Sequence, residues 1–204
     1  LQLNIKVDTL PEDASTTPRI NVADIVVTDD GLGENLLSLS GADAALFEID
    51  GNVLYLNAGA ALDFETNPAL DVTITVADED AGSSQVQFTL NVDNVAPSVT
   101  ATSATVTVSE GSPAGNTGTW SDAAGASDTV TLTASVGTVT KDAGGTWSWS
   151  YTPADGPASS TVTITAADED GGSSQVQFTL NVDNVAPSVA AASAAVTVSE
   201  GSPA

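Results

Sequence analysis

Apolar and polar residues alternate along most of the 204-residue chain, which is the pattern of strands that bury one face. The segments VTITVAD (72–78) and QVQFTLNV (85–92) show it most clearly, and both are rich in β-branched residues. The intervening residues, EDAGSS, include Gly and Ser, which favour a tight turn. We therefore predict that these two strands form a β-hairpin.

The same alternation predicts further strands in both halves of the chain. They span 4–8, 23–29, 35–41 and 52–58 in the first half, and 104–110, 129–135, 137–143 and 146–152 in the second. No window keeps an apolar 3.6-residue period over three helical turns, and only 41–49 suggests a helical turn. About seven strands per unit, joined by short turns, favour a Greek-key β-sandwich. The predicted fold class is therefore all-β.

A long internal repeat indicates how the domains are organised. Residues 71–114 recur at 161–204, and the copies differ only at positions 71, 76, 81, 100, 102 and 105 of the first. A period of this length fits one small β-sandwich per unit, and the near identity favours recent duplication within an array. We expect two tandem sandwiches, at 1–94 and 95–185, joined by an extended linker. We interpret 186–204 as the start of a third repeat, and the chain as part of a longer protein.

Aromatic residues are concentrated in one predicted strand, TWSWSYT (146–152). Trp147, Trp149 and Tyr151 share one of its faces. They are either a platform that stacks on sugar rings or the inner face of a sandwich. The unit has few other aromatic residues, so we favour the inner face. Trp120 is assigned to the core for the same reason.

The charge of the chain is strongly acidic, with 27 Asp and Glu against three Lys and Arg and a formal net charge of −24. This surface repels phosphate backbones and anionic lipids, so we expect neither nucleic-acid binding nor binding to a membrane surface. The sequence has no apolar run long enough to span a bilayer, so we also expect no direct membrane insertion. It attracts cations, either diffusely as a solubilising coat or at defined sites. Cys and His are absent, which removes disulfides and the usual nucleophile–base pairs, so we do not expect an enzyme.

The positions of the acidic residues favour defined sites over a coat. ADED closes a predicted strand at 77–80 and again at 167–170, and NVDN closes the last strand of each unit. Pro97 and Pro187 then keep the following linkers extended. Carboxylates thus gather at the tips of the predicted sandwiches, where one domain meets the next.

Several motifs of the first unit resemble, in order, those of a cadherin repeat. Pro11-Glu12 occupies the place of an acidic residue near the end of the first strand. FEID (47–50) resembles the family's Phe-x-Ile-Asp segment, and LDFE (62–65) resembles its Leu-Asp-Arg-Glu motif. The first unit is therefore similar to a cadherin repeat over nearly all of residues 1–97.

Three acidic segments extend this resemblance. VVTDDG (26–31) resembles the family's Asp-x-Asp element, ITVADEDAG (74–82) its Ala-x-Asp-x-Gly turn, and NVDNVAP (91–97) its Asp-x-Asn-Asp-Asn-Ala-Pro linker. The second unit resembles bacterial cadherin-like or immunoglobulin-like repeats of large surface adhesins. There, YTPADG (151–156) stands where the first unit has LDFET.

The resemblance implies calcium between successive domains. The implied ligands are Glu12, Asp63 and Glu65 of the first domain, Asp93 and Asn94 of the linker, and Asp122, Asp168 and Asp170 of the second domain. The second Asp of the family's Asp-x-Asp pair is Ala124 here, although Asp128 lies nearby. Since the linker also departs from the family pattern, we expect one or two Ca²⁺ ions rather than three.

The outer tips of the two units carry further acidic residues that we interpret as half-sites for neighbouring repeats. They are Asp29, Asp30, Asp78 and Asp80 in the first unit, and Glu110, Asp155, Asp183 and Asn184 in the second.

The resemblance implies a calcium-binding extracellular repeat module, a calcium-rigidified stalk segment of a bacterial adhesin-like surface protein. Its expected partners are neighbouring repeats of the same chain. The alternative is a calcium-dependent carbohydrate-binding module, whose partner would be a polysaccharide or another cell-surface ligand.

Overall fold

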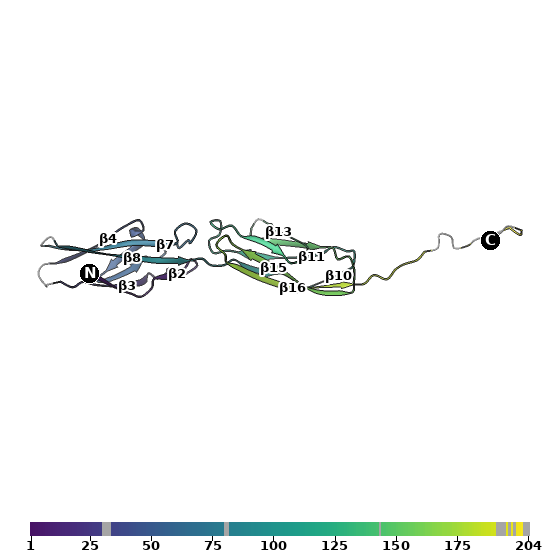
Figure 1. Cartoon of the computed structure of the whole chain (residues 1–204), viewed down its shortest axis with the longest axis horizontal. Coiled ribbons are helices and arrows are strands. Elements are labelled where there is room, and N and C mark those ends of the chain that lie inside the picture. Colours follow the sequence, from purple (N-terminus) through teal and green to yellow (C-terminus); the bar gives the residue numbers. More distant parts are fainter. Residues whose placement is uncertain are drawn as a thin grey trace.

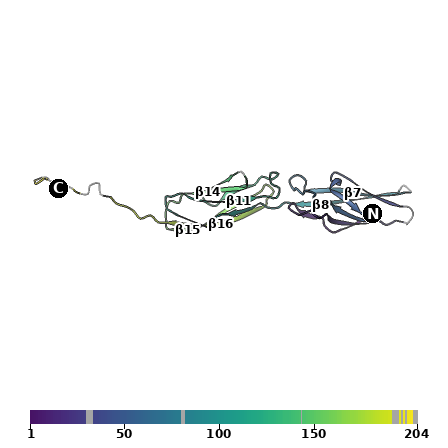
Figure 2. The ribbon, with the colours of Figure 1, turned by 180° about the vertical axis from the view of Figure 1, so that it is seen from behind.

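The computed structural model describes residues 1–29, 34–79, 82–142, 144–190, 195, 197 and 199–201. These residues form two β-sandwiches that lie end to end along the long axis of the molecule (Figures 1 and 2). Strands β1–β8 build the first sandwich and strands β9–β16 the second. The described part of the chain contains one short 3-10 helix, η1 (Ala44–Leu46), and no helix long and apolar enough to cross a membrane. The predicted all-β fold with two tandem sandwiches is confirmed.

The first sandwich consists of two four-stranded sheets. One has the order β1 (Gln2–Ile5), β3 (Ile20–Val26), β6 (Val53–Leu56) and β5 (Phe47–Asp50), and the other β2 (Thr9–Pro11), β8 (Ser83–Asp93), β7 (Ala69–Asp78) and β4 (Asn35–Ser40). Alternate residues point inward, so Leu54, Ile74 and Leu90 are fully buried. Phe47 meets Phe88 edge to face across the two sheets.

The second sandwich repeats the arrangement of two four-stranded sheets. One has the order β13 (Thr138–Asp142), β14 (Thr146–Tyr151), β11 (Ala114–Ser121) and β9 (Ser98–Ala101), and the other β10 (Thr105–Ser109), β16 (Ser173–Asp183), β15 (Ala158–Ala167) and β12 (Thr131–Ala134). In each sandwich a short strand lies parallel to the last strand, β2 beside β8 and β10 beside β16. This pairing places the end of the short strand next to the start of the following linker.

The tryptophans of β14 lie in the core of the second sandwich. Trp147 and Trp149 are 1% and 2% exposed. Their indole Nε1 groups donate to the carbonyl oxygens of Thr100 (3.0 Å) and Val136 (2.7 Å), and Trp149 packs edge to face on Phe178. The inner-face interpretation is confirmed, and the interpretation of these rings as an exposed sugar platform is wrong.

The strand predictions are accurate for the long alternating segments. Strands β7 and β8 form the predicted antiparallel hairpin. Within the described ranges, each sandwich has eight strands rather than about seven. The additional strands are short or, like β11, do not alternate regularly between apolar and polar residues. In β11 the inward positions include Asn116 and Gly118 in place of apolar residues. Asn116 exchanges two hydrogen bonds with the backbone of Ser103, and a Cβ at Gly118 would lie 2.5 Å from the ring of Trp147.

The predicted third repeat is described only in part. Residues 186–190 follow β16 without regular secondary structure, and of 191–204 only 195, 197 and 199–201 are described. None of these described residues lies in a strand.

Candidate metal centre

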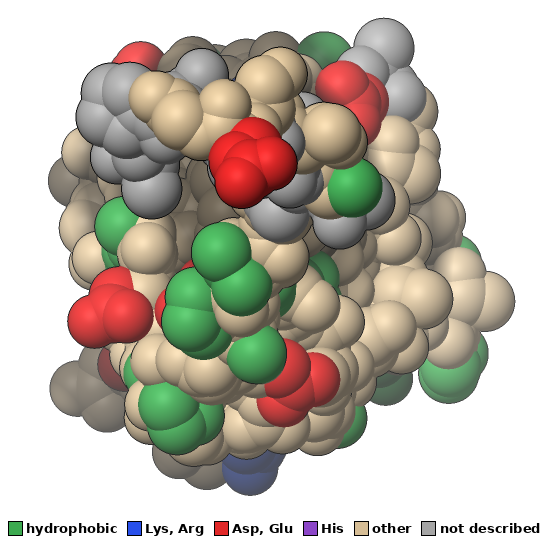
Figure 3. Space-filling view, turned by 90° about the vertical axis from the view of Figure 1, so that its right-hand side faces the viewer, with side chains coloured by type: hydrophobic (Ala, Val, Ile, Leu, Met, Phe, Trp, Pro, Cys, Tyr) green, Lys and Arg blue, Asp and Glu red, His purple; other side chains and the backbone are tan. Residues whose placement is uncertain are grey.

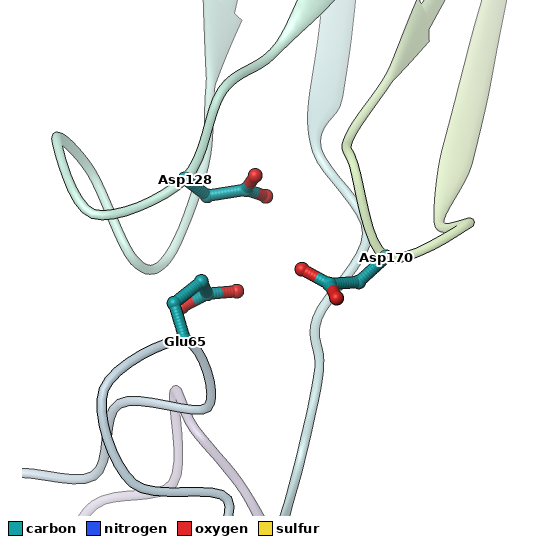
Figure 4. A group of neighbouring side chains, drawn as sticks. All are labelled: Glu65, Asp128 and Asp170. Atoms are coloured by element: carbon teal, nitrogen blue, oxygen red, sulfur yellow. The ribbon is translucent and has the colours of Figure 1, made fainter.

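Acidic side chains from both sandwiches meet at the junction around the linker 94–97. The β6–β7 loop of the first sandwich carries Glu65, the β11–β12 loop of the second carries Asp128, and the β15–β16 turn carries Asp170. Figure 4 shows that the three carboxylates point toward one another, with Glu65 on one side of the junction and the two aspartates on the other. The fold therefore concentrates negative charge between the domains.

Two groups of three carboxylates lie close enough to hold metal ions. Glu65, Asp128 and Asp170 form one group, and Asp122, Asp128 and Asp168 form the other; within each group the candidate ligand oxygens lie within 4.8 Å of one another. Two oxygens on opposite sides of a Ca²⁺ ion are about 4.6–5.2 Å apart, given its usual bond lengths. The separations therefore suit a shared ion, and Asp128 belongs to both groups.

Many oxygens of this cluster are buried without a partner among the described residues. Asp128 is only 8% exposed, and neither of its carboxylate oxygens has a hydrogen bond. Both oxygens of Glu65, Oδ2 of Asp122 and Oδ1 of Asn94 are likewise buried and unpartnered. Buried polar atoms are rarely left unsatisfied, and a buried anion is especially costly when unpaired. A cation between these oxygens would satisfy them together.

In the absence of a cation, the surroundings of these carboxylates disfavour their ionised forms. Burial, followed by repulsion from Glu12 and Asp128, raises the pKa of Glu65 to about 7. Burial also raises the pKa values of Asp122 and Asp170, and the negative charge of Asp128 adds to both effects. A bound cation would reverse these shifts, since it favours the charged forms.

Local backbone geometry fixes several of these side chains. Oδ1 of Asp122 accepts a hydrogen bond from the backbone N–H of Ala124 (3.0 Å). Oδ1 of Asp168 accepts from the backbone N–H of Gly172 (2.6 Å), and its Oδ2 accepts from the amide of Asn94 (3.1 Å), which ties the linker to the second domain. A Cβ at Gly172 would lie 2.9 Å from Cα of Ala96, so this turn needs glycine where the linker passes.

Three of the predicted acidic ligands lie outside both groups and make other contacts. The buried carboxylate of Glu12 accepts from the backbone N–H groups of Val95 (2.9 Å) and Phe64 (3.4 Å), and so orients the linker and the β6–β7 loop. The side chain of Asp93 is exposed, and its carbonyl oxygen accepts from the N–H of Glu12 (3.0 Å).

Asp63 is the third of these residues. Its Oδ1 accepts from the N–H of Thr66 (2.9 Å), which holds the pKa of Asp63 below its ordinary value. Its Oδ2 accepts from the hydroxyl of Ser127 in the second domain (3.1 Å). Asp63 thus joins the two domains directly.

The remaining predicted ligands lie in the cluster. Glu65, Asp122, Asp168 and Asp170 belong to the two groups, and Asn94 offers its unpartnered amide oxygen beside Asp168. Asp128 was not among the predicted ligands, although it is the residue common to both groups. Asp128 lies just before β12, so it is an acidic residue near the end of a strand, like the acidic residues at the other tips.

The far end of the second sandwich repeats part of the junction. The N–H of Glu110 donates to the carbonyl oxygen of Asp183 (3.0 Å), and its carboxylate accepts from the N–H groups of Val185 (2.9 Å) and Gly156 (2.6 Å). These contacts are the counterparts of those made by Glu12. Figure 3 views the molecule from this side and shows separate acidic side chains among hydrophobic ones and other groups.

The outer tip of the first sandwich also carries acidic residues. Oδ2 of Asp29 accepts from the amide of Asn35 (2.9 Å), and Oδ1 of Asp78 is buried and unpartnered among the described residues. Asp30 and Asp80, which we also assigned to this half-site, lie outside the described residues. Among the described residues, groups of three candidate ligands occur only at the junction.

Comparisons with known proteins found one matching family and several similar solved structures. Residues 94–181 match the family described as bacterial Ig domain, which confirms the immunoglobulin-like resemblance of the second unit. No curated protein sequence matches the chain. Similar solved structures include the protocadherin gammaB7 EC3-6 cis-dimer, with 23% identity, a TM-score of 0.44, and coverage of 91% of this chain and 47% of that one.

Two further cadherin structures are similar. The extracellular cadherin domains 1–5 of protocadherin gamma B2 share 21% identity with a TM-score of 0.43, over 90% of this chain and 39% of that one. Chicken VE-cadherin EC1-2 shares 17% identity with a TM-score of 0.40, over 86% of this chain and 96% of that one. The chain thus spans about half the length, or less, of these protocadherin structures.

Proposed function

We propose that this chain is a calcium-binding segment of the extracellular stalk of a bacterial adhesin-like protein, in which Ca²⁺ holds two successive repeats in one orientation. The observation that supports it most is the meeting of carboxylates from both sandwiches, with buried oxygens that lack partners among the described residues. A ligand set contributed by two domains couples ion binding to their relative placement. The ion therefore acts on the junction rather than on either core.

The donor atoms favour calcium over other metals. All candidate ligands are oxygens, and the chain contains no His or Cys to select zinc, copper or iron. Calcium takes about 6–8 oxygens in flexible geometry, whereas Mg²⁺ demands a small octahedral site. Because Asp128 is common to both groups, we propose one or two ions, with Asp128 bridging them when two are bound. Backbone carbonyls and water complete the coordination.

Binding of the ion changes the electrostatic interaction between the two domains from repulsive to attractive. Two carboxylates about 4 Å apart repel by about 1–4 kcal/mol, depending on the local dielectric constant. Without a cation this repulsion pushes the domains apart. Extracellular calcium modules bind at about 10⁻⁴–10⁻³ M. Free calcium about 100-fold above the dissociation constant would contribute about 2.7 kcal/mol per site. Calcium thus converts a repulsive junction into a rigid one.

The end-to-end arrangement of the sandwiches suits a stalk (Figure 1). We place the domains at 1–94 and 95–185 and assign 186–204 to the start of a third repeat. Neighbouring repeats of the same chain are the proposed partners, because Glu110 reproduces at the far tip the backbone contacts that Glu12 makes at the junction. The calcium-dependent carbohydrate-binding alternative has less support, since Trp147 and Trp149 are buried.

Isothermal calorimetry tests the proposed ligand set. We expect the chain to bind one or two Ca²⁺ ions, and the double variant Glu65→Gln, Asp170→Asn to lose the ion held between the domains. Asp142, an exposed residue of the second sandwich outside both groups, supplies the matched control Asp142→Asn. Absence of calcium binding at millimolar concentration, or equal binding by the double variant, would rule out this assignment.

A further inference from the structure

The loop that joins β11 to β12 carries two ligands of the proposed centre but has little internal structure. Between Asp122 and Ser127 it contains only Ala and Gly. Its internal hydrogen bonds run from the N–H of Ala124 to Asp122 and from the N–H of Ser127 to the carbonyl oxygen of Ala124. These contacts form two local turns and do not fix the distance between Asp122 and Asp128.

Lys141 of β13 contacts both ends of this loop. Its Nζ donates a hydrogen bond to the carbonyl oxygen of Val130 (2.6 Å) and lies 4.6 Å from the ring centroid of Trp120. Trp120 lies two residues before Asp122, and Val130 lies two residues after Asp128. One ammonium group therefore joins the segments that enter and leave the loop.

Both contact points are themselves anchored in the fold. The N–H of Trp120 donates to the carbonyl oxygen of Gly145 (2.9 Å), and its ring packs against the core of the second sandwich. Val130 is 1% exposed. In the β13–β14 ladder, the backbone of Lys141 pairs with that of the buried Trp147. Trp120, Val130 and Lys141 therefore hold the two ends of a loop that has few internal hydrogen bonds.

One flank of the loop borders open space. A shallow, open depression of about 430 Å³ lies between the loop and the β13–β14 turn, and its lining includes Trp120, Asp122, Gly125 and Gly145. A loop beside such a space can shift unless its ends are tied. The contacts of Lys141 are placed to prevent this shift.

We propose that Lys141 is a positioning residue for the metal centre: by tying Trp120 to Val130, it sets the separation of Asp122 and Asp128. This inference rests on the proposed function. An ammonium group cannot itself ligate a metal, and as a positive charge it would repel Ca²⁺. The positional effect and the charge effect therefore have opposite signs, which makes them separable.

The test compares calcium affinity in three variants. Lys141→Met keeps the aliphatic stem and removes the donor, Lys141→Arg keeps a donor and a ring-stacking cation, and Lys6→Met removes a positive charge from the exposed Lys6–Asp24 ion pair of the first sandwich. Loss of residues that orient metal ligands typically weakens affinity about 10–100-fold. We expect about tenfold weaker binding for Lys141→Met, recovery of most of it in Lys141→Arg, and no weakening for Lys6→Met.

If Lys141→Met binds calcium as tightly as the original chain, or more tightly, the inference is overturned. In that case Lys141 acts only through its positive charge, whose removal favours calcium binding. Near-ultraviolet circular dichroism in chelator verifies that the tryptophan core of each variant is intact. If the original chain binds no calcium, the proposed function fails, and a metal-free measurement still decides the role of Lys141. In chelator, the amides of 123–128 should exchange hydrogen faster in Lys141→Met than in Lys6→Met. Equal exchange would show that Lys141 does not hold the loop.

Discussion

Replacing Asp128 with asparagine should have opposite effects with and without calcium. Asp128 is 8% exposed, has no hydrogen-bond partner among the described residues, and belongs to both carboxylate groups. Asparagine keeps its shape and removes its charge. In chelator the change relieves repulsion within the cluster. In calcium it weakens a ligand that both proposed ions share.

The magnitudes follow from the separations in the cluster. Repulsion between two carboxylates about 4 Å apart is about 1–4 kcal/mol, and the low end applies because the other members are partly solvated. We therefore expect Asp128→Asn to raise the free energy of unfolding in chelator by about 1–2 kcal/mol. For a domain of this size, each 1 kcal/mol corresponds to roughly 4–8 °C in the thermal midpoint. In calcium, a tenfold loss of affinity would reduce the stabilisation from about 2.7 to about 1.4 kcal/mol per site.

Differential scanning calorimetry in chelator and in millimolar calcium measures both effects. The midpoint of Asp128→Asn should lie above that of the original chain in chelator and should rise less on addition of calcium. Asp142→Asn removes an exposed charge of the same sandwich outside the cluster and serves as the control. A lower midpoint for Asp128→Asn in chelator would show that the charge of Asp128 does not destabilise the cluster, and an unchanged calcium response would show that Asp128 is not a ligand.

Three further changes test other parts of the structure. The pKa of Glu65 is raised from 4.5 to about 7, so folding favours the protonated form of this side chain. In chelator, the thermal midpoint should therefore fall as the pH rises from 4.5 through 7, and Glu65→Gln should make the midpoint less dependent on pH. Gly172→Ala should weaken calcium binding in calorimetry, because its Cβ would displace the linker at Ala96; unchanged affinity would contradict this. Gly118→Ala should destabilise the second sandwich by about 1–3 kcal/mol in urea unfolding, since its Cβ would overlap the ring of Trp147; an unchanged urea midpoint would contradict this.

The fold was predictable where one residue pattern dominated. Strands β7 and β8 are long and alternate strictly, because one face packs on the core and the other faces water. Strand β11 was missed because two of its inward positions are not apolar. The Asn116 side chain hydrogen-bonds to the backbone N–H and carbonyl groups of Ser103, and Gly118 leaves space for the ring of Trp147. Such positions depend on a partner elsewhere in the fold and leave no periodic signal.

The candidate site was predictable as a region and less so as a set of atoms. Strand ends place acidic residues at the tips, and the cadherin resemblance implied Glu65 and Asp170 as ligands at the junction. Which oxygens converge depends on how each loop folds back. Asp128 reaches the centre through the path of its loop, whereas the carboxylate of Glu12 is engaged by backbone N–H groups. Sequence spacing carries no information on these side-chain directions.

Small-angle X-ray scattering of the two-domain chain tests the calcium-stiffened junction most directly. We expect a longer maximum dimension and a narrower range of shapes in calcium than in chelator, and we expect magnesium not to replace calcium. Glu65→Gln combined with Asp170→Asn should keep the chelator-like curve at every calcium concentration. Superimposable curves for the original chain in calcium and in chelator would show that calcium does not stiffen the junction.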